Sequence, residues 1–263
     1  MKGAAQGGES GLSLRLARDE ADLRAAQRLR YDVFVAELGA DGPLVDHAAR
    51  LERDEFDAHF DHLLLVDDRA TQGDLPHVVG VYRLMASERA AEAGRFYSEA
   101  EYDLRCLRAS GRRLLELGRS CVHPDHRGGA AMFLLWNGLA DYVLERGIEV
   151  LFGVASFHGT DVQALAQPLS YLHHHHLAPE ALRVRARAGA RADMALVAPD
   201  RLDRKAAMAG TPALIKAYLR LGGFVGEGAY VDHAFNTTDV CLVMDTARMS
   251  ARHRDFYTKG RAA

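Results

Sequence analysis

The stretch ELGRSCVHPDHRGGAAMF, from Glu116 to Phe133, decides how this chain folds. Its first half has the composition of a β-strand that ends at His123-Pro124-Asp125. The chain then turns through Arg127-Gly128-Gly129 into small residues that open a helix. A strand, a glycine turn and a helix N-terminus together predict an anion site, because the first N–H groups of a helix have no partner within it.

The composition is typical of a soluble globular protein: the chain has 263 residues, of which 48% are hydrophobic and 26% charged. No apolar run approaches the ~20 residues that a membrane-spanning helix needs. The net charge of -3 argues against general nucleic-acid binding. Three cysteines (Cys106, Cys121 and Cys241) without paired spacing argue against a disulfide framework and predict a cytoplasmic protein.

Apolar periodicity and turn residues predict alternating helices and strands. Ser98 and Glu101 have the spacing of a capping box before a short helix, and Asp161 is expected to cap a helix leading to His173–His176. The other expected elements are a helix capped by Asp19 and ending by Gly39, a hairpin of strands 62–67 and 77–85, a strand at 113–122, a helix from Ala130 to Gly147, a strand at 150–157, a helix opened by Thr211-Pro212, and closing strands within 228–244.

These elements predict one α/β domain that spans residues 14–245, with a mixed central sheet flanked by helices. Residues 160–210 are expected to form a helical elaboration of it. Residues 1–13 are expected to be a disordered lead, since they are rich in small residues and lack an apolar signal core. Residues 246–263 are expected to be a basic tail.

The central motif resembles that of the Gcn5-related N-acyltransferase (GNAT) superfamily, in which a strand, a basic glycine loop and a helix hold the pantetheine arm and phosphate of an acyl thioester. The resemblance implies a GNAT fold. The usual loop is Arg/Gln-x-x-Gly-x-Gly/Ala, and the second glycine is missing here. A single phosphodiester tolerates this departure better than a pyrophosphate, which favours acyl carrier protein over coenzyme A. The phosphopantetheine-binding residues are then Arg127, Gly128, Gly129, Ala130, Ala131 and Met132.

Several further motifs narrow the resemblance. LRYDVFVAELG, FDAHFDHLLL, GVYRL and ELGRSCV occur in the same order as in acyl-homoserine-lactone synthases. ELGRSCVHPDHR, LLWNGLADYV, FGVASFHGTD, LHHHHLAP, LIKAYLRLGG and FNTTDVC resemble the ornithine Nα-acyltransferase (lyso-ornithine-lipid synthase) family, sometimes labelled haemolysin-like. The resemblance covers the chain from about Leu14 to Asp245.

This resemblance implies transfer of a 3-hydroxyacyl chain from acyl carrier protein to the α-amine of ornithine, which gives lyso-ornithine lipid. The donor is the 4′-phosphopantetheine of the carrier, and no permanently bound cofactor is expected. Glutamine, lysine or glycine as acceptor, or lactone synthesis, stay open as alternatives. A membrane-active, lipid-binding protein is the alternative outside enzymes. The amphiphilic product suggests peripheral contact with the inner membrane, for which the basic and apolar helix Pro212–Leu221 is a candidate.

Acylation of an amine needs a base, because an α-amine with a pKa near ~8 is mostly protonated in the cytoplasm. Glu116 is the candidate base, and a structural ion pair with Arg119 is the alternative reading. Residues three apart on a regular strand face opposite sides, so a shared site for both requires a bulge, expected at Gly118. A backbone N–H just after the bulge, at Val122, is the candidate oxyanion donor.

The amino-acid substrate needs partners for its carboxylate and for its side-chain amine. Arg30, Arg83 and Arg119 are the candidates for the carboxylate, because a guanidinium binds two oxygens at once. The candidates for the amine are Glu37, Asp57 and Asp239, each with a surface salt bridge as the alternative reading. Phe34 is a candidate to line the acyl channel.

Three other features are expected to have structural or docking roles. Cys121 is expected to be a core residue rather than a nucleophile. No metal site is expected, because consecutive residues of the run His173–His176 point around a helix and cannot bind one ion together. Acyl carrier protein is acidic, so it needs a local basic patch, for which Arg105–Arg113 and Arg183–Arg191 are the candidates.

Overall fold

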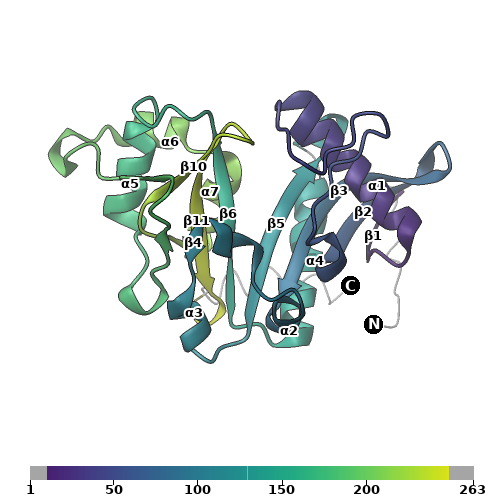
Figure 1. The fold of residues 1–263 in the computed structure, drawn as a ribbon, viewed down its shortest axis with the longest axis horizontal. Helices are drawn as coiled ribbons and strands as arrows, with labels where there is room; N and C mark the ends of the chain where they lie inside the picture. The colour runs from purple at the N-terminus through teal and green to yellow at the C-terminus, as the bar shows by residue number, and fades with distance from the viewer. Residues whose placement is uncertain (1–10, 129, 249–263) are drawn as a thin grey trace. The chain divides into compact units, whose positions relative to one another are not determined.

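The computed structural model describes residues 11–128 and 130–248 (Figure 1). The chain divides into two compact units: unit 1 comprises Met1–Gly94 and Leu117–Gly147, and unit 2 comprises Arg95–Glu116 and Ile148–Ala263. Strand β5 (Leu114–Val122) contributes its first residues to unit 2 and the others to unit 1. Each unit is described by itself below.

Unit 1 is built on a sheet whose strands lie in the order β1, β2, β3 and β5. Strands β1 (Leu12–Leu16), β2 (Asp61–Gln72) and β3 (Leu75–Ala86) pair antiparallel with one another in sequence. The β2–β3 pair is the predicted hairpin. Its residues are β-branched and leucine-rich, and most of β3 is buried, as expected for a strand covered on both faces.

Helix α1 (Glu20–Arg30) covers one face of this sheet. Asp19 caps it by accepting a hydrogen bond from the Asp22 N–H (3.0 Å), as predicted. The helix continues as a π-helix, η1 (Tyr31–Glu37), and the chain leaves it at Gly39, where φ is +75°. The buried cluster beneath α1 comprises Ala25, Ala26, Leu29, Val33, Leu64, Val66, Val78, Val81 and Cys121.

Helix α4 (Ala131–Arg146) lies against the other face and approaches the strands closely at two glycines. A Cβ at Gly138 would lie 2.3 Å from Cδ2 of Leu14, and one at Gly80 would lie 2.9 Å from Cδ1 of Leu135. Both contacts need the absence of a side chain. The helix ends at Gly147, which has the predicted left-handed C-cap conformation, with φ +61°.

The sheet of unit 2 begins with the first residues of β5 and continues through β6, β11, β10 and β8. Strands β5 and β6 (Val150–His158) are parallel, from the pair Leu114 and Val150 to the pair Glu116 and Phe152. Strand β11 (Thr237–Asp245) pairs antiparallel with the full length of β6. This mixture of parallel and antiparallel pairs is the predicted mixed sheet.

The remaining elements are short. The helices are α2 (Ser87–Glu92), α3 (Arg105–Ala109), α5 (Ala166–His176), α6 (Arg204–Gly210) and α7 (Ala213–Arg220). The strands are β4 (Tyr102–Asp103), β7 (Arg185–Ala186), β8 (Arg191–Ala192), β9 (Phe224–Val225) and β10 (Ala229–Asp232). The 3-10 turns are η2 (Asp57–His59), η3 (Tyr97–Ala100), η4 (Pro124–His126), η5 (Glu180–Leu182), η6 (Pro199–Arg201) and η7 (Thr246–Arg248). No helix within residues 11–128 and 130–248 is long and apolar enough to cross a membrane.

The structure corrects two of the predicted caps. Ser98 and Glu101 do not form a capping box, because the Ser98 hydroxyl bonds to Glu116 instead. The Asp161 carboxylate accepts from the N–H groups of the next turn, and α5 begins only at Ala166. The segment 160–210 contains the two helices α5 and α6 together with short strands and turns. The predicted lead overlaps β1, which begins at Leu12, while residues 1–10 and 249–263 lie outside the described residues.

Candidate active site

The strand that carries the motif, β5, departs from regular geometry at one residue. Arg119 has a left-handed backbone conformation, with φ +48°. For a residue with a side chain this conformation costs about 1–2 kcal/mol, so other contacts must hold it. The sequence predicted a bulge at Gly118, and the residue with the left-handed backbone is the next one, Arg119, whose side-chain contacts are described below.

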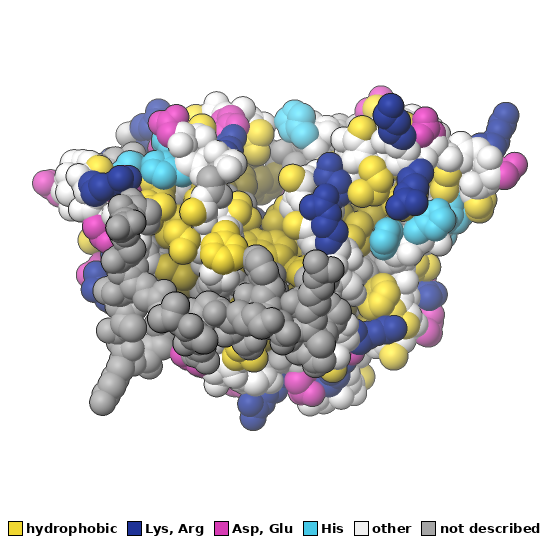
Figure 2. Space-filling view, turned by 180° about the vertical axis from the view of Figure 1, so that it is seen from behind, with side chains coloured by type: hydrophobic (Ala, Val, Ile, Leu, Met, Phe, Trp, Pro, Cys, Tyr) yellow, Lys and Arg dark blue, Asp and Glu magenta, His cyan; other side chains and the backbone are white. Residues whose placement is uncertain are grey.

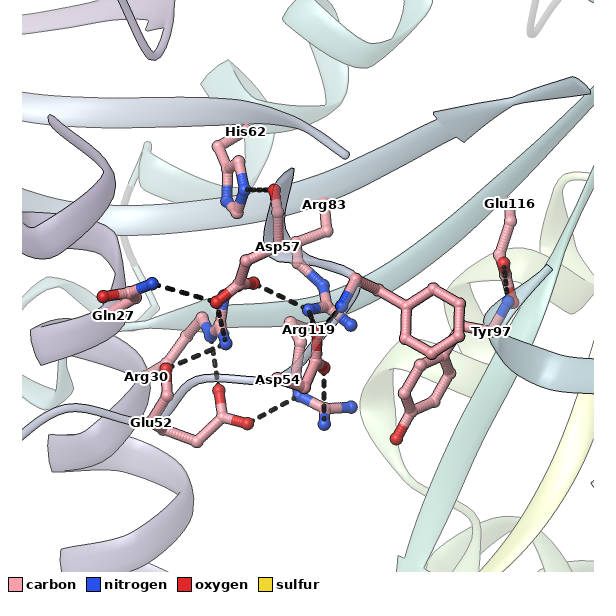
Figure 3. Close-up of polar contacts among 11 residues, drawn as sticks. Gln27, Arg30, Glu52, Asp54, Asp57, His62, Arg83, Tyr97, Glu116 and Arg119 are labelled. Atoms are coloured by element: carbon pink, nitrogen blue, oxygen red, sulfur yellow. Dashed lines mark hydrogen bonds and ion pairs between the residues drawn. The ribbon is translucent and has the colours of Figure 1, made fainter. Parts of the chain in front are cut away.

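In unit 2, the carboxylate of Glu116 is buried and accepts hydrogen bonds from the start of η3. The Tyr97 N–H donates to Oε2 (2.7 Å), and the Ser98 N–H donates to Oε1 (2.6 Å). The Ser98 hydroxyl also donates to Oε1. Figure 3 shows Glu116 pointing from its strand toward the backbone at Tyr97. Glu116 thus caps a 3-10 turn, and the same three donors fix the direction of its carboxylate.

In unit 1, three arginines and three carboxylates form a buried network of ion pairs (Figure 3). Arg30 donates through Nε to Glu52 (2.5 Å) and through Nη1 to Asp57 (2.6 Å). Arg83 Nη1 donates to Asp54 (2.7 Å) and Asp57 (2.8 Å). The formal charges of the six side chains cancel, which is the condition under which such groups are found in an interior.

The third arginine of the network is Arg119. Its Nε donates to Glu52 Oε1 (3.2 Å) and its Nη2 to Asp54 Oδ2 (3.3 Å). The side chains of Arg119 and Asp54 keep 12% and 18% of their surface exposed, whereas those of Arg30 and Arg83 keep none. Arg119 and Asp54 are therefore the edge of the network that a ligand can reach.

The network shifts the protonation of its members. Burial alone would raise the pKa of Glu52, but the charges of the three guanidiniums outweigh it and lower that pKa to about 2. Burial would also raise the pKa of Asp57, which Arg30 and Arg83 hold well below its usual range. Burial lowers the pKa of His62 to about 4, and its Nε2 lies 3.0 Å from the backbone oxygen of Asp57. Both carboxylates are therefore charged and the imidazole neutral near neutral pH.

The network contains four residues that the sequence predicted as substrate ligands. Arg30, Arg83 and Asp57 each have partners inside it, and Arg119 is the member with accessible surface. Their roles as ligands stay predictions, and the geometry favours Arg119. The sequence analysis missed Glu52 and Asp54, and the signal that could have indicated them is the acidic stretch that precedes β2.

The predicted phosphate loop lies between η4 and α4. Gly128 has φ +77°, which a residue with a side chain rarely adopts, and the N-cap residue of α4, Ala130, makes no side-chain cap. Ala131 and Met132 form the first turn of α4 after the N-cap Ala130. Gly129 lies outside the described residues. The arrangement of the described part is that of a helix N-terminus able to receive an anion.

Arg127 connects this loop to the π-helix η1. Its Nε donates to the backbone oxygen of Val122 (3.0 Å), and its two terminal nitrogens donate to the two carboxylate oxygens of Glu37 (2.6 Å each). Glu37, predicted as an amine ligand, thus contacts the loop arginine. Phe34 of the same π-helix packs against the core beneath α1. The roles of Phe34, Glu37 and the Val122 N–H in substrate binding and catalysis stay predictions.

The described residues give Cys121 and the histidine run structural environments. Cys121 belongs to the buried cluster under α1, and burial raises the pKa of its thiol to about 12, so the core role is confirmed. His174 contacts the backbone oxygen of Val197, and the rings of His175 and His176 pack on Tyr171.

Asp239 lies in unit 2 with two other acidic residues. Within residues 11–128 and 130–248, one group of three His, Cys, Asp or Glu side chains has the spacing of a cation site. Its members are Glu101, Asp232 and Asp239, and one ligand atom of each lies within 4.8 Å of those of the other two. Asp239 and Glu101 are buried. This concentration of negative charge is suited to a cationic group, and the predicted role of Asp239 toward the substrate amine stays open.

Neither predicted docking patch for an acidic carrier presents a set of bare cations. In the first patch, Arg105, Arg108 and Arg112 pair with Asp103, Glu99 and Asp245, each at 2.6 Å. In the second, Arg183 and Arg185 pair with Glu180, and Arg191 pairs with Glu227. On the face drawn in Figure 2, basic side chains are scattered among acidic and hydrophobic ones. The helix predicted to contact lipid, α7, buries its Ile215 and Tyr218.

The comparisons with known proteins agree with this fold. The family model of the acetyltransferase (GNAT) domain matches residues 29–137. The acyl-homoserine-lactone synthase LasI has a similar structure, with a TM-score of 0.51 at 15% sequence identity over 95% of this chain and 96% of its own. This low identity supports the fold alone. The chain is thus an acyltransferase with the GNAT fold, as its motifs indicated.

Two curated relatives narrow the class. An L-ornithine N(alpha)-acyltransferase of Rhodobacter capsulatus is 69% identical over 246 residues, which cover 94% of either chain. One of Brucella abortus is 42% identical over 94% of this chain and 88% of its own length. The chain belongs to the family of L-ornithine N(alpha)-acyltransferases.

Proposed function

We propose that this enzyme transfers a 3-hydroxyacyl chain from acyl carrier protein to the α-amine of ornithine and so produces lyso-ornithine lipid. The observation that carries the proposal is the 69% identity, along 94% of both chains, to a relative named L-ornithine N(alpha)-acyltransferase. At that identity the residues that select the acceptor are expected to be largely shared. The motif around β5 supplies the chemical groups.

In the proposed mechanism, the α-amine of ornithine attacks the thioester carbonyl carbon. Glu116 accepts the proton that the ammonium must lose first, directly or through one water molecule. The carbonyl oxygen becomes an oxyanion, for which the backbone N–H of Val122 is the assigned donor. When the intermediate collapses, the C–S bond breaks, the nitrogen loses its second proton to the departing sulfur or to water, and the amide forms. The thiolate has a pKa near ~8.5, so it needs little help in leaving, and Glu116 then returns its own proton to water.

The donor end is assigned to the loop before α4. Gly128, Ala130 and the first turn of α4 are assigned to one phosphodiester through their backbone N–H groups. Arg127 precedes them, and its guanidinium is paired with Glu37, so a phosphate that binds Arg127 has to share it with or displace that carboxylate. The missing second glycine of the usual loop favours this smaller anion over a pyrophosphate. Acyl carrier protein is therefore the proposed donor, and a coenzyme A thioester is the alternative to test against it.

The acceptor is proposed to be recognised through its charges. Arg119 is assigned to the ornithine carboxylate, because it is the arginine of the network with accessible surface. In unit 2, Asp239, with Glu101 and Asp232 close by, stays a separate candidate for the side-chain amine. Arg30, Arg83 and Asp57 support Arg119 through Glu52 and Asp54.

A release assay tests the proposal. The purified protein is incubated with 3-hydroxyacyl carrier protein and, in separate reactions, ornithine, glutamine, lysine, glycine or no amino acid. Free carrier thiol and product mass are followed together, and matching reactions use the 3-hydroxyacyl coenzyme A thioester. Thiol release that requires ornithine, with the mass of the N-acyl product, is the expected result. Release with a different acceptor or only with the coenzyme A thioester would replace that part of the proposal. No release from folded protein would favour the lipid-binding alternative.

A further inference from the structure

The side chain that holds Glu116 in place is that of Ser98. Ser98 has no exposed surface. It donates two hydrogen bonds to Glu116 Oε1, one from its backbone N–H (2.6 Å) and one from its hydroxyl. Tyr97 contributes one backbone N–H to Oε2 (2.7 Å). Two donors from one residue to one oxygen restrict rotation of the carboxylate. Figure 3 shows Glu116 pointing toward the backbone at Tyr97, the residue before Ser98 in this turn.

The turn that carries Ser98 is anchored without the hydroxyl. The Glu99 carboxylate accepts from the Phe96 N–H (2.8 Å) and from Arg108 Nη2 (2.6 Å). The Phe96 ring packs edge to face on Phe152 of β6, with ring centroids 5.0 Å apart. The turn thus has anchors other than the Ser98 hydroxyl, and the partner that this hydroxyl contacts is the carboxylate that the proposed function uses as base.

We propose that Ser98 is a positioning residue for acyl transfer: its hydroxyl orients the Glu116 carboxylate and keeps it ionised so that it can accept the proton of the attacking amine. The inference rests on the proposed role of Glu116. A hydroxyl that donates to a carboxylate stabilises the charged form over the protonated one, because a protonated carboxyl is a poorer acceptor. Without the hydroxyl, Glu116 binds a proton at higher pH and rotates more freely.

Cys241, a titratable group of unit 2, interacts with the charge of Glu116, and Glu101 interacts with Cys241. Cys241 is on β11, and burial, together with the charges of Glu116 and Glu101, raises the pKa of its thiol well above the usual value. The thiol is therefore neutral throughout the range in which the enzyme is assayed. Glu101 follows η3 in the chain, and its carboxylate is close enough to Cys241 to contribute to that shift. A change confined to Ser98 leaves both groups in place.

The test compares Ser98→Ala with Ser170→Ala, a matched control. Ser170 is equally buried in unit 2, and its hydroxyl oxygen accepts from the N–H groups of Leu196 (3.0 Å) and Val197 (2.9 Å), away from Glu116. The pH profile of kcat/KM for ornithine is measured for both. In Ser98→Ala the acidic limb is expected to move up by roughly one pH unit, with about a tenfold loss at pH values below the limb. In Ser170→Ala the profile keeps its wild-type position, whatever the loss of thermal stability.

A second readout does not depend on turnover. The carboxyl 13C resonance of Glu116, assigned by its loss in Glu116→Gln, is titrated in wild type and in Ser98→Ala. Its midpoint is expected to rise in the variant. If Ser98→Ala does not fold, Ser98→Cys, whose thiol is a weak donor, is expected to raise it as well. An unchanged midpoint would overturn the positioning role even in an active enzyme. A raised midpoint in Ser98→Ala, combined with a wild-type protein that transfers no acyl group, would keep the contact between Ser98 and Glu116 and reject the proposed function.

Discussion

At the residue scale, Glu116 has two roles that one substitution can separate. As a cap of η3 it needs an oxygen acceptor, and as a base it needs a proton-accepting carboxylate. Glu116→Gln keeps an acceptor for Ser98 and removes the base. We expect kcat/KM for ornithine acylation to fall by about 10²–10⁴-fold. The loss is measured by carrier-thiol release.

The same substitution carries a structural cost that must be measured beside the activity. A glutamine nitrogen facing the Tyr97 N–H would leave two donors opposed, at a cost of about 1–3 kcal/mol in folding stability. A thermal melt of Glu116→Gln that starts below the assay temperature and continues above it shows whether the variant is folded during the assay. Glu145→Gln, at an exposed glutamate of α4, is the control and is expected to be fully active. Wild-type activity in Glu116→Gln would leave Glu116 with the capping role alone.

The site residues show what a sequence can and cannot predict at this scale. The left-handed residue of β5, Arg119, lies one residue after the bulge expected at Gly118. That bulge was expected because residues 116 and 119 cannot face the same side of a regular strand. The burial of Arg30 and Arg83 was not predictable, because a sequence gives the charge of a side chain and not the carboxylates that surround it. Ser98 was assigned to the wrong glutamate because Glu101 is near in sequence, whereas Glu116 reaches it through the fold.

At the element scale, the helix α4 depends on two missing side chains. In an exposed helix interior, replacing glycine by alanine stabilises a protein by up to about 1 kcal/mol. At Gly138 the opposite sign is expected, because the new Cβ would lie 2.3 Å from Leu14 Cδ2 and 3.3 Å from Leu63 Cδ1. We expect Gly138→Ala to lower the free energy of unfolding by about 1–3 kcal/mol, as overpacked cores do.

Urea unfolding of Gly138→Ala and of Gly189→Ala measures this difference. A Cβ at Gly189 would meet no atom within 4 Å, and its backbone conformation is an ordinary one. Gly189→Ala is therefore expected to match the wild type or exceed its stability slightly. Equal midpoints for the two variants would mean that Leu14 moves aside at no cost.

Strands and long helices were predicted well because apolar runs and caps are local signals. The strands β2, β3, β5 and β6 fall where their β-branched and leucine-rich runs predicted them. The π-helix η1 was not predicted, because its composition is that of an ordinary helix and nothing in the sequence marks the extra residue in its turns. The start of α5 was placed too early for a related reason: Asp161 does cap a turn, but that turn does not continue as a helix.

At the scale of the whole molecule, the ion-pair network makes stability depend on pH in a definite direction. His62 has a folded pKa of about 4, below its usual value near 6.5, because it is buried. The unfolded chain therefore binds more protons than the folded one between these values. The contribution of His62 to the free energy of unfolding is fully present above pH ~6.5 and is lost as the pH falls toward 4. This group gives a slope of at most about 1.4 kcal/mol per pH unit.

Glu52 extends the loss to lower pH. Its folded pKa of about 2 lies below the usual value of 4.5, so its contribution is present above pH 4.5 and disappears as the pH falls toward 2. Free energies of unfolding are measured by urea titration at intervals from pH 7 to pH 3, in wild type and in His62→Gln. Glutamine keeps a donor for the Asp57 backbone oxygen but does not titrate. The wild type is expected to lose more stability than His62→Gln between pH 6.5 and 4, and both are expected to lose stability in parallel below pH 4. Parallel curves over the whole range would mean that His62 has the same pKa in the folded and the unfolded protein, so that burial does not keep its imidazole neutral.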